Sequence, residues 1–314
     1  MQNPNRNESG VFDVVVVGGG PAGLSAAYWL GRYRRRVRLY DVGEWRNRVA
    51  RAVHGFPGVP DVPPAELYER MHAQAIGAGA ELRSGRVVAI SGEKDDFLVH
   101  VAGERPARAR RILLAYGVRD VVPDIPGLAE AYGTTVHHCP DCDGPDVLGK
   151  AVGVIGWSRA AAGLALFLLT WAERVTLLGN GAAERLDRAI HDSLDRYGVA
   201  IRNVPITRVD QCAGRVRAVE LEGGERLPLE HLFFHIGTRP GSGLGEELGC
   251  AVDENDGLVV DQGQETTTPG VYAAGDVVGH PHLVASAAAD GIKAALAMHR
   301  SLLPADFEFR GRMD

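Results

Sequence analysis

The sequence is poor in lysine, and its basic residues are scattered along the chain. Only three lysines accompany 31 arginines among the 314 residues, and the formal net charge is −6. No contiguous run of basic side chains is present that would follow a phosphate backbone. We therefore expect no nucleic-acid partner.

Long apolar runs and a secretion signal are also missing. The longest nearly uncharged stretch, residues 160–172, would span about 20 Å as a helix, whereas a bilayer core needs about 30 Å. This stretch predicts a buried helix and no membrane contact. The first ten residues, MQNPNRNESG, hold no apolar segment behind a basic start, so we expect no signal peptide and a cytoplasmic protein.

Cysteine is scarce, with four residues in the chain. Cys212 and Cys250 stand alone and are expected to be inert core thiols. Cys139 and Cys142 lie in the stretch HHCPDCDG, which fits a zinc half-site, a structural disulfide or a redox centre. No second Cys-x-x-Cys completes a zinc site, and a disulfide over so short a loop constrains little entropy. The redox interpretation is favoured, and no metal is expected.

A complete strand, glycine-rich turn, helix and second strand runs over residues 12–41. Four consecutive valines predict a strand buried on both faces, and Gly18, Gly20 and Gly23 fit the pattern G-x-G-x-x-G. The glycines permit a tight turn and the approach of a pyrophosphate, while Asp41 can accept a hydrogen bond from a ribose. This segment predicts a dinucleotide-binding unit.

Two further segments have the shape of nucleotide-binding turns. The second strand-turn-helix begins near residue 150. Gly156 opens its turn and Trp157 follows, but Ser158 stands where the second glycine of a dinucleotide site belongs, and Ala161 fills the third place. Near the end of the chain, Gly275 and Asp276 follow an apolar strand, a position suited to a ribityl or phosphate group. An ordinary turn capped by the aspartate is the alternative.

Together these motifs resemble the small, two-domain thioredoxin reductases and their FAD-dependent relatives. The resemblance rests on GGGPAG, AYG followed by VPDIPG, CPDCDG, GTRP and AAGD, and it covers nearly the whole chain. It implies an α/β fold of two three-layer Rossmann-like domains, the second inserted into the first, and a homodimer. The expected FAD-binding domain comprises residues 1–117 and 246–314, and residues 118–245 form an NAD(P)-binding-like domain that carries the cysteine pair.

The resemblance also implies roles for the residues of CPDCDG. Cys142 would face the flavin, Cys139 would attack a protein or small-molecule disulfide, and Asp143 would transfer the proton. An aspartate in that role needs a pKa raised by burial. His137 and His138 lie next to the thiols, where a cationic imidazole would lower a thiol pKa; solvated histidines are the equal alternative.

The nicotinamide side departs from the family pattern. Besides Trp157 and Ser158, the arginines that hold the 2′-phosphate of NADPH are missing, since residues 179–181 read GNG. Each lost charged hydrogen bond is worth about 1.5–3 kcal/mol, which predicts weak NADPH binding. Arg174 or Arg185 are possible substitutes, although their spacing gives no reason to expect it.

Similar departures occur in branches of the family that do not use pyridine nucleotides. Their partners are ferredoxin, oxygen with a small dithiol, or a second flavin, on which Trp157 would stack unless it faces the core. An NADPH-dependent thioredoxin reductase, a dithiol oxidase and a flavin- or metal-binding module with structural cysteines all stay open. Tyr116 lies in AYG, where the family usually has ATG, and would either alter the packing of the hinge or contact the flavin. Near the end of the chain, Phe307 and Phe309 would cover the flavin, pack on a dimer mate or belong to a frayed terminus.

Overall fold

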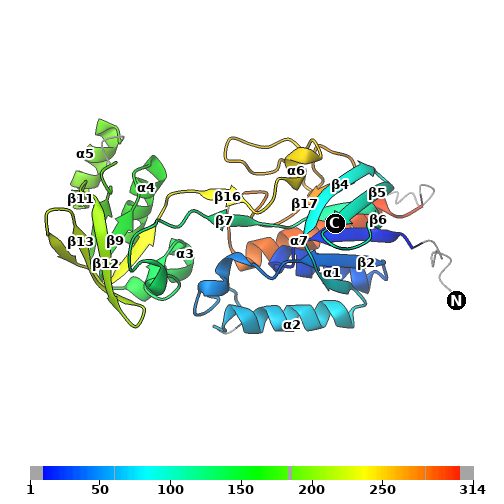
Figure 1. Ribbon diagram of the computed structural model, residues 1–314, viewed down its shortest axis with the longest axis horizontal. Coiled ribbons are helices and arrows are strands. Elements are labelled where there is room, and N and C mark those ends of the chain that lie inside the picture. Colours follow the sequence, from blue (N-terminus) through cyan, green and yellow to red (C-terminus); the bar gives the residue numbers. More distant parts are fainter. Residues whose placement is uncertain (1–9, 60, 183–185, 280, 305–314) are drawn as a thin grey trace. The chain divides into compact units, whose positions relative to one another are not determined.

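The computed structural model describes residues 10–59, 61–182, 186–279 and 281–304 of the chain (Figure 1). Residues 1–9, Arg185, Phe307 and Phe309, about which the sequence made predictions, lie outside these ranges. No described helix has both the length and the hydrophobicity that a membrane crossing requires. The chain forms two compact units, the first of Met1–Trp45, Ala65–Val118 and Pro240–Asp314, the second of Arg46–Pro64 and Arg119–Arg239.

The first unit is built on a sheet in the order β3-β2-β1-β6-β5-β4, with β17 also paired to β6. Strands β1, β2, β3, β6 and β17 run parallel, whereas β4 and β5 are antiparallel to their neighbours. Its elements are β1 (Phe12–Val17), α1 (Pro21–Arg32), β2 (Val37–Asp41), α2 (Pro64–Gly77), β3 (Glu81–Ser84), β4 (Val87–Glu93), β5 (Asp96–Val101), β6 (Ala107–Leu114), α6 (Leu244–Glu247), β17 (Val271–Ala273) and α7 (Val284–Ser301).

The predicted core strand and helix of this unit are confirmed. The valines of β1 are buried on both faces, as a central parallel strand requires, and α1 packs closely against α7 (Figure 1). At the crossing of the two helices, Gly291 lies so close to α1 that a Cβ there would stand 2.0 Å from the carbonyl oxygen of Ala22. Only glycine therefore fits at this contact.

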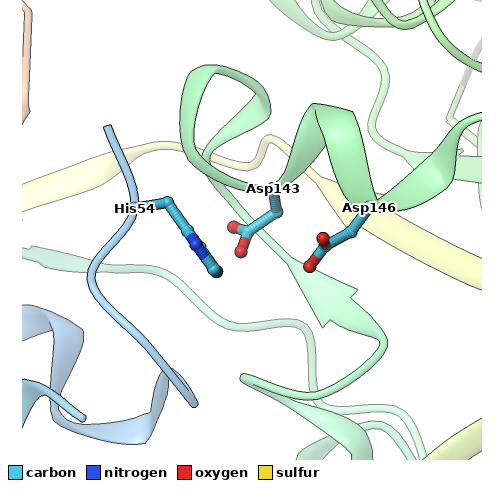
Figure 2. Close-up of side chains that lie close together, drawn as sticks. All are labelled: His54, Asp143 and Asp146. Carbon is cyan, nitrogen blue, oxygen red and sulfur yellow. The ribbon is translucent and has the colours of Figure 1, made fainter. Parts of the chain in front are cut away.

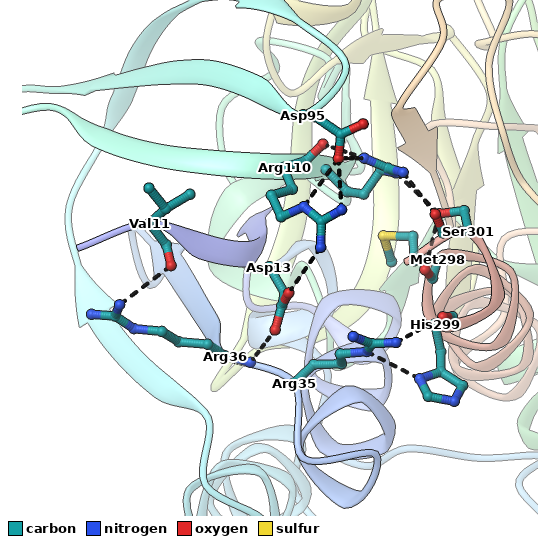
Figure 3. Close-up of polar contacts among 10 residues, drawn as sticks. Val11, Asp13, Arg35, Arg36, Asp95, Arg110, Met298, His299 and Ser301 are labelled. Atoms are coloured by element: carbon teal, nitrogen blue, oxygen red, sulfur yellow. Dashed lines mark hydrogen bonds and ion pairs between the residues drawn. The ribbon is translucent and has the colours of Figure 1, made fainter. Parts of the chain in front are cut away.

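Arginines of β6 and of the loop before β2 bind the carboxyl end of α7 (Figure 3). Arg111, 1% exposed, donates to the Ser301 carbonyl at 2.8 Å and to Asp95 Oδ1 at 2.8 Å. Arg35 donates to the carbonyl of His299 at 3.1 Å. These cations occupy the negative end of the helix dipole and satisfy carbonyls that the helix itself leaves unpaired.

The second unit contains a fully parallel sheet in the order β11-β10-β9-β15-β8 and a three-stranded antiparallel sheet, β12-β13-β14. The predicted α/β fold with two Rossmann-like sheets is thereby confirmed. Its elements are η1 (Arg46–Val49), η2 (Ala129–Ala131), β8 (Val136–His137), α3 (Pro140–Asp143), η3 (Gly144–Val147), β9 (Ala151–Ile155), α4 (Arg159–Leu168), β10 (Arg174–Leu178), α5 (Arg188–Arg196), β11 (Ala200–Arg202), β12 (Ile206–Cys212), β13 (Arg215–Leu221), β14 (Arg226–Pro228) and β15 (His231–Phe234).

The segment Arg46–Pro64 belongs to the second unit by its contacts, which the sequence did not predict. Arg46 forms an ion pair with Asp120 at 2.6 Å, and Gly133 approaches the Val49 carbonyl so closely that a Cβ would stand 1.9 Å away. Two short strands, β7 (Val118–Asp120) and β16 (Thr238–Pro240), pair where the chain passes between the units.

Replacing Gly291 by alanine is expected to destabilise the protein, because the new methyl group meets backbone that cannot move aside. Overpacking of this kind costs about 1–3 kcal/mol. Gly163, on the exposed side of α4 with no atom near its missing Cβ, is the matched control. Gly163→Ala should be neutral or stabilising by up to about 1 kcal/mol. Thermal unfolding followed by circular dichroism checks both, and an unchanged midpoint in Gly291→Ala would contradict the close packing.

Candidate active site

The three glycines of the first motif have different structural tasks. Gly18 has φ +109°, and a Cβ there would stand 2.3 Å from the carbonyl oxygen of Ala115. Gly23 packs on the turn itself, since its Cβ would stand 1.9 Å from the Gly18 carbonyl oxygen. Gly20 precedes α1 and has open space, its nearest neighbour being the Tyr68 hydroxyl at 4.0 Å. The turn is thus compact on the sheet side and open above Gly20.

Asp41 is held against this turn at the carboxyl end of β2. Its Oδ1 accepts a hydrogen bond from the backbone N–H of Gly19 at 3.1 Å. A Cβ at Gly19 would lie 2.6 Å from the carboxyl carbon, so the carboxylate occupies the place of a side chain. The geometry leaves the second oxygen of Asp41 for another donor.

Two aromatic residues that the sequence did not single out border the same turn. Trp45 and Tyr68 stack with ring centroids 4.5 Å apart. Burial raises the pKa of the Tyr68 phenol, as do the nearby negative charges of Asp276 and Asp41. The indole Nε1 of Trp45 is buried without a hydrogen-bond partner. A buried donor in this state fits a ligand that brings acceptor oxygens.

Gly275 and Asp276 close the remaining side of the turn. Gly275 has φ +81°, and a Cβ there would stand 2.9 Å from the Cβ of Ala22 in α1. The turn after β17 thus meets the start of α1, which brings the glycine turn, Asp41 and Asp276 together from separate segments of the chain. This open turn, its two carboxylates and its unpaired donor fit a dinucleotide such as FAD.

The cysteine pair forms a disulfide in the second unit. Cys139 is the N-cap residue of α3, where its Sγ accepts from the backbone N–H of Cys142 at 3.2 Å. Pro140 begins the helix, and Gly144 follows it under the ring of Trp171, which a Cβ would approach to 2.5 Å. The whole CPDCDG motif therefore has one local structure, in which both sulfurs and Asp143 lie within a single turn.

Asp143 is surrounded by other polar groups. Its Oδ2 lies 3.4 Å from His137 Nδ1, and its side chain is 18% exposed. Figure 2 shows its carboxylate facing the imidazole of His54, with Asp146 on the other side. One ligand atom from each of these three residues lies within 4.8 Å of the others, although His54 Nδ1 already contacts Asp61 Oδ2 at 3.0 Å. We interpret the cluster as the polar surroundings of Asp143.

Neither histidine before the cysteines is solvated, which makes that alternative wrong. His137 is 4% exposed, and its Nε2 lies 3.1 Å from Nδ1 of His231. His138 bonds through Nδ1 to the Tyr132 hydroxyl at 3.0 Å. Burial lowers the pKa of His138, so it is uncharged near neutral pH and does not act as the cation that would lower a thiol pKa.

In the turn after β9, the polar groups bond within the protein and the space beside Gly156 is filled. A Cβ at Gly156 would stand 2.5 Å from Ala161, and the hydroxyl of Ser158 caps α4 by accepting from the Ala161 N–H at 3.1 Å. Trp157 is half-buried and joins none of the hydrophobic clusters found among the described residues, so it does not face the core. Its stacking on a ligand stays a prediction.

The expected position of the phosphate-binding arginines is taken by Asn180, whose side-chain oxygen accepts from the Ile206 N–H at 2.7 Å. Arg174 cannot substitute. It pairs with Ala151 at the amino end of the sheet, about 13 Å of strand away from the turn at Gly156. Arg202 ends the neighbouring strand, but its guanidinium contacts Glu225 at 3.2 Å.

Two other predictions can be followed in the structure. Tyr116 packs against the core of the first unit, and burial raises the pKa of its phenol to about 12 while the backbone of Gly245 forms a hydrogen bond with it. Cys250 is buried, as expected, and contacts the hydroxyl of Thr266. Cys212 is exposed at the end of an antiparallel strand, so the prediction of a core thiol was wrong there.

Comparison with known proteins agrees with this geometry. Residues 12–291 match the pyridine nucleotide-disulphide oxidoreductase family. The chain belongs to this family. It is 30% identical to a thioredoxin reductase of Aquifex aeolicus, with 96% of this chain and 95% of that protein covered. The chain is therefore a thioredoxin reductase-like, FAD-dependent oxidoreductase that acts on sulfur groups, as the sequence predicted.

Two solved structures have the same fold over nearly the whole chain. The crystal structure of HlmI superposes with a TM-score of 0.88 at 35% identity, covering 94% of this chain and 93% of that one. An oxidoreductase from Agrobacterium tumefaciens gives a TM-score of 0.84 at 37% identity, covering 93% and 98%.

Asp41→Asn is expected to weaken FAD binding about tenfold or more, because a charged acceptor contributes about 1.5–3 kcal/mol and the amide keeps only a neutral one. Asp13→Asn is the control, since Asp13 lies at the opposite end of β1 and accepts from the Arg36 N–H. Flavin fluorescence on titration of the apoprotein measures both affinities. Equal affinity in Asp41→Asn and the unmodified protein would remove Asp41 from the site.

Proposed function

We propose that this enzyme passes electrons between FAD and the Cys139–Cys142 disulfide, and that NADPH is a poor electron donor for it. The observation that carries the proposal is the disulfide at the start of α3, joined in one turn to Asp143. A structural role explains the pair less well, because a cross-link between residues three apart constrains little of the unfolded chain.

The first unit would hold the flavin. Gly18 and Gly23 make the turn compact, and the open space at Gly20 would take the pyrophosphate. Asp41 would accept from a ribose hydroxyl, and Gly275 with Asp276 would border the ribityl side. When bound, FAD would supply a two-electron carrier, and Cys142 would be the cysteine that exchanges electrons with it. The residues of this chain would orient the flavin and the disulfide and transfer the proton.

Asp143 would manage the proton. When the disulfide opens, one sulfur leaves as a thiolate and needs a proton; when a thiol attacks, its proton must be removed. A carboxyl group adjacent to Cys142 in sequence and facing two imidazoles can exchange that proton in both directions.

Weak use of NADPH is supported by how the second unit uses its own polar groups. Ser158 and Asn180 are bonded internally, and Arg174 lies at the far end of its strand. Ser158 stands where a pyrophosphate site needs its second glycine, and the half-buried Trp157 precedes it in the turn. A second flavin, ferredoxin or oxygen then serves as the electron partner, with Trp157 suited to stack on a flat ring.

Several finer properties stay predictions. The substrate is a disulfide or dithiol on a protein or a small molecule, and the enzyme is expected to be a cytoplasmic homodimer. The second candidate function is that of an NADPH-dependent thioredoxin reductase. It is favoured because the chain is similar over nearly its whole length to a protein named thioredoxin reductase in Aquifex aeolicus.

Anaerobic spectroscopy tests the central proposal. After anaerobic mixing, dithiothreitol should bleach the flavin absorbance of the holoenzyme. Excess NADPH or NADH should leave the flavin oxidised over the same time. Cys142→Ser should abolish bleaching by the dithiol, because the thiol proposed to exchange electrons with the flavin is gone. Cys212→Ser, which changes an exposed free thiol, should behave like the unmodified enzyme.

Two outcomes would contradict the proposal. Bleaching of Cys142→Ser at the unmodified rate would exclude communication through this pair. Rapid stoichiometric bleaching by either nucleotide would return the protein to the NADPH-dependent enzymes. The flavin-to-protein ratio of the same sample reports whether one or two flavins are bound.

Asp143→Asn is expected to retain FAD and the disulfide but to slow flavin–dithiol exchange by about 10²- to 10⁴-fold, the usual contribution of a positioned acid or base. Asp146→Asn is the control, because Asp146 faces the same cluster and is exposed. Stopped-flow rates between pH 6 and 9 measure both variants. Unchanged rates for Asp143→Asn across this range would exclude the carboxyl group from the mechanism.

A further inference from the structure

Strand register brings three residues of the second unit onto one face of its parallel sheet. His137 of β8 pairs with Phe233 of β15, and His231 lies two residues earlier on the same strand. His231 pairs with Val152 of β9, and Lys150 again lies two residues earlier in the chain. Because side chains alternate with a period of two, all three share the face, diagonally across adjacent strands.

The polar atoms of these residues form an unbroken chain that ends at Asp143. Lys150 Nζ lies 3.0 Å from His231 Nε2, and His231 Nδ1 lies 3.1 Å from His137 Nε2. His137 Nδ1 lies 3.4 Å from Asp143 Oδ2, a distance that catalytic contacts commonly shorten once substrate is bound. The two imidazole rings are stacked with an interplanar angle of 11°.

The direction of the hydrogen bonds follows from the first of them. An ammonium group only donates, so His231 Nε2 accepts from Lys150 and its Nδ1 carries the proton. His231 therefore donates to His137 Nε2, which leaves the proton of His137 on Nδ1, toward Asp143. Every donor in the series points from Lys150 to the carboxylate.

Burial isolates the middle of the series and leaves its far end in contact with water. His137 and His231 are 4% and 7% exposed, whereas Lys150, directly before β9, is half-buried. Buried polar groups are costly unless they are bonded, and a pair of imidazoles in the core brings no packing advantage over apolar side chains. The arrangement therefore calls for a functional explanation.

We propose that Lys150, His231 and His137 form a proton relay that connects Asp143 with solvent during disulfide–dithiol exchange. The relay rests on the proposed function, because it serves the proton that Asp143 exchanges with the cysteine pair. In this proposal the three residues exchange protons with Asp143 and not directly with the cysteine sulfurs.

The relay balances with the electron transfer. Two-electron reduction of the disulfide, for which bound FAD would supply the electrons, breaks the S–S bond and leaves one sulfur as a thiolate and the other in need of one proton. Asp143 delivers that proton as it receives the Nδ1 proton of His137. His137 Nε2 takes the Nδ1 proton of His231, and His231 Nε2 takes a proton from the Lys150 ammonium, which becomes a neutral amine. When a substrate disulfide reoxidises the cysteine pair, the S–S bond re-forms and the substrate disulfide is reduced to its dithiol with protons from water. The thiol proton then moves outward along the same bonds to the Lys150 amine. This restores the original tautomers and the ammonium group, which exchanges protons with water.

The charge state of His231 suits this task. Burial, the Lys150 ammonium and His137 lower the pKa of His231 to about 3, so the ring stays neutral at working pH and can accept at one nitrogen while donating at the other. Asp143 opposes this shift and Arg215 adds to it. At the other end, His54 and Asp146 face Asp143, and the relay does not require either of them.

Substitution of Lys150 separates proton transfer from electrostatics. Lys150→Arg keeps the charge and a donor, but a guanidinium does not release its proton. Both Lys150→Arg and Lys150→Ala should slow flavin–dithiol exchange roughly 10- to 100-fold, within the range for positioned proton transfer. Added methylamine should restore the rate of Lys150→Ala in proportion to its concentration. Lys293→Ala, which removes an exposed lysine of α7, is the control.

His231→Gln provides the second variant, because the amide keeps a bond to Lys150 and similar volume without passing a proton. It should match Lys150→Arg in rate while binding FAD normally. Normal exchange in Lys150→Arg would overturn the relay, as would slow exchange in Lys150→Ala that methylamine does not rescue. Failure of the proposed function is distinguishable, since the unmodified holoenzyme would then show no exchange that depends on Cys142.

Discussion

The redox helix depends on the parallel pairing of β8, a strand of only two residues, with β15. Val136 and His137 pair with Leu232 and Phe233, and the cysteine motif begins one residue after His137. So short a strand contributes little by itself, but Val136 is fully buried and His137 lies against Phe233, with ring centroids 5.1 Å apart. The same pairing that fixes Cys139 at the edge of the sheet therefore also fixes the imidazole beside Asp143.

Lysine is rare in this chain, and Lys150 has a property that arginine lacks. Arginine makes two of the buried polar contacts: Arg46 pairs with Asp120, and Arg111 bonds to a carbonyl at the end of α7. Arginine suits those tasks because it presents several donors in a plane and never loses its charge. A lysine is found where the cation meets a neutral imidazole, and a lysine is the cation that can give up a proton and regain it from water.

Local patterns predicted the first nucleotide-binding unit well, since Gly18, Gly23 and Asp41 act through neighbours only a turn or a strand away. The sequence could not reveal that Tyr68 lies beside Gly20 or that His231 bonds to His137. Both contacts depend on the packing of segments far apart in the chain. The register of the parallel strands decides the second of them. The fold of the unit thus follows from periodicity, whereas the surroundings of its reactive groups follow from tertiary structure.

The two glycine-rich turns of the chain differ in how their polar groups are satisfied. At the first, the Trp45 indole N–H is buried without a partner and Gly20 has open space, so a bound ligand would complete bonds that the protein leaves unmade. At the second, the Ser158 hydroxyl already occupies a helix N–H, and Asn180 is bonded to Ile206. A ligand there would have to displace existing bonds or add only stacking, which is the physical basis for proposing a strong site at the first turn and a weak one at the second.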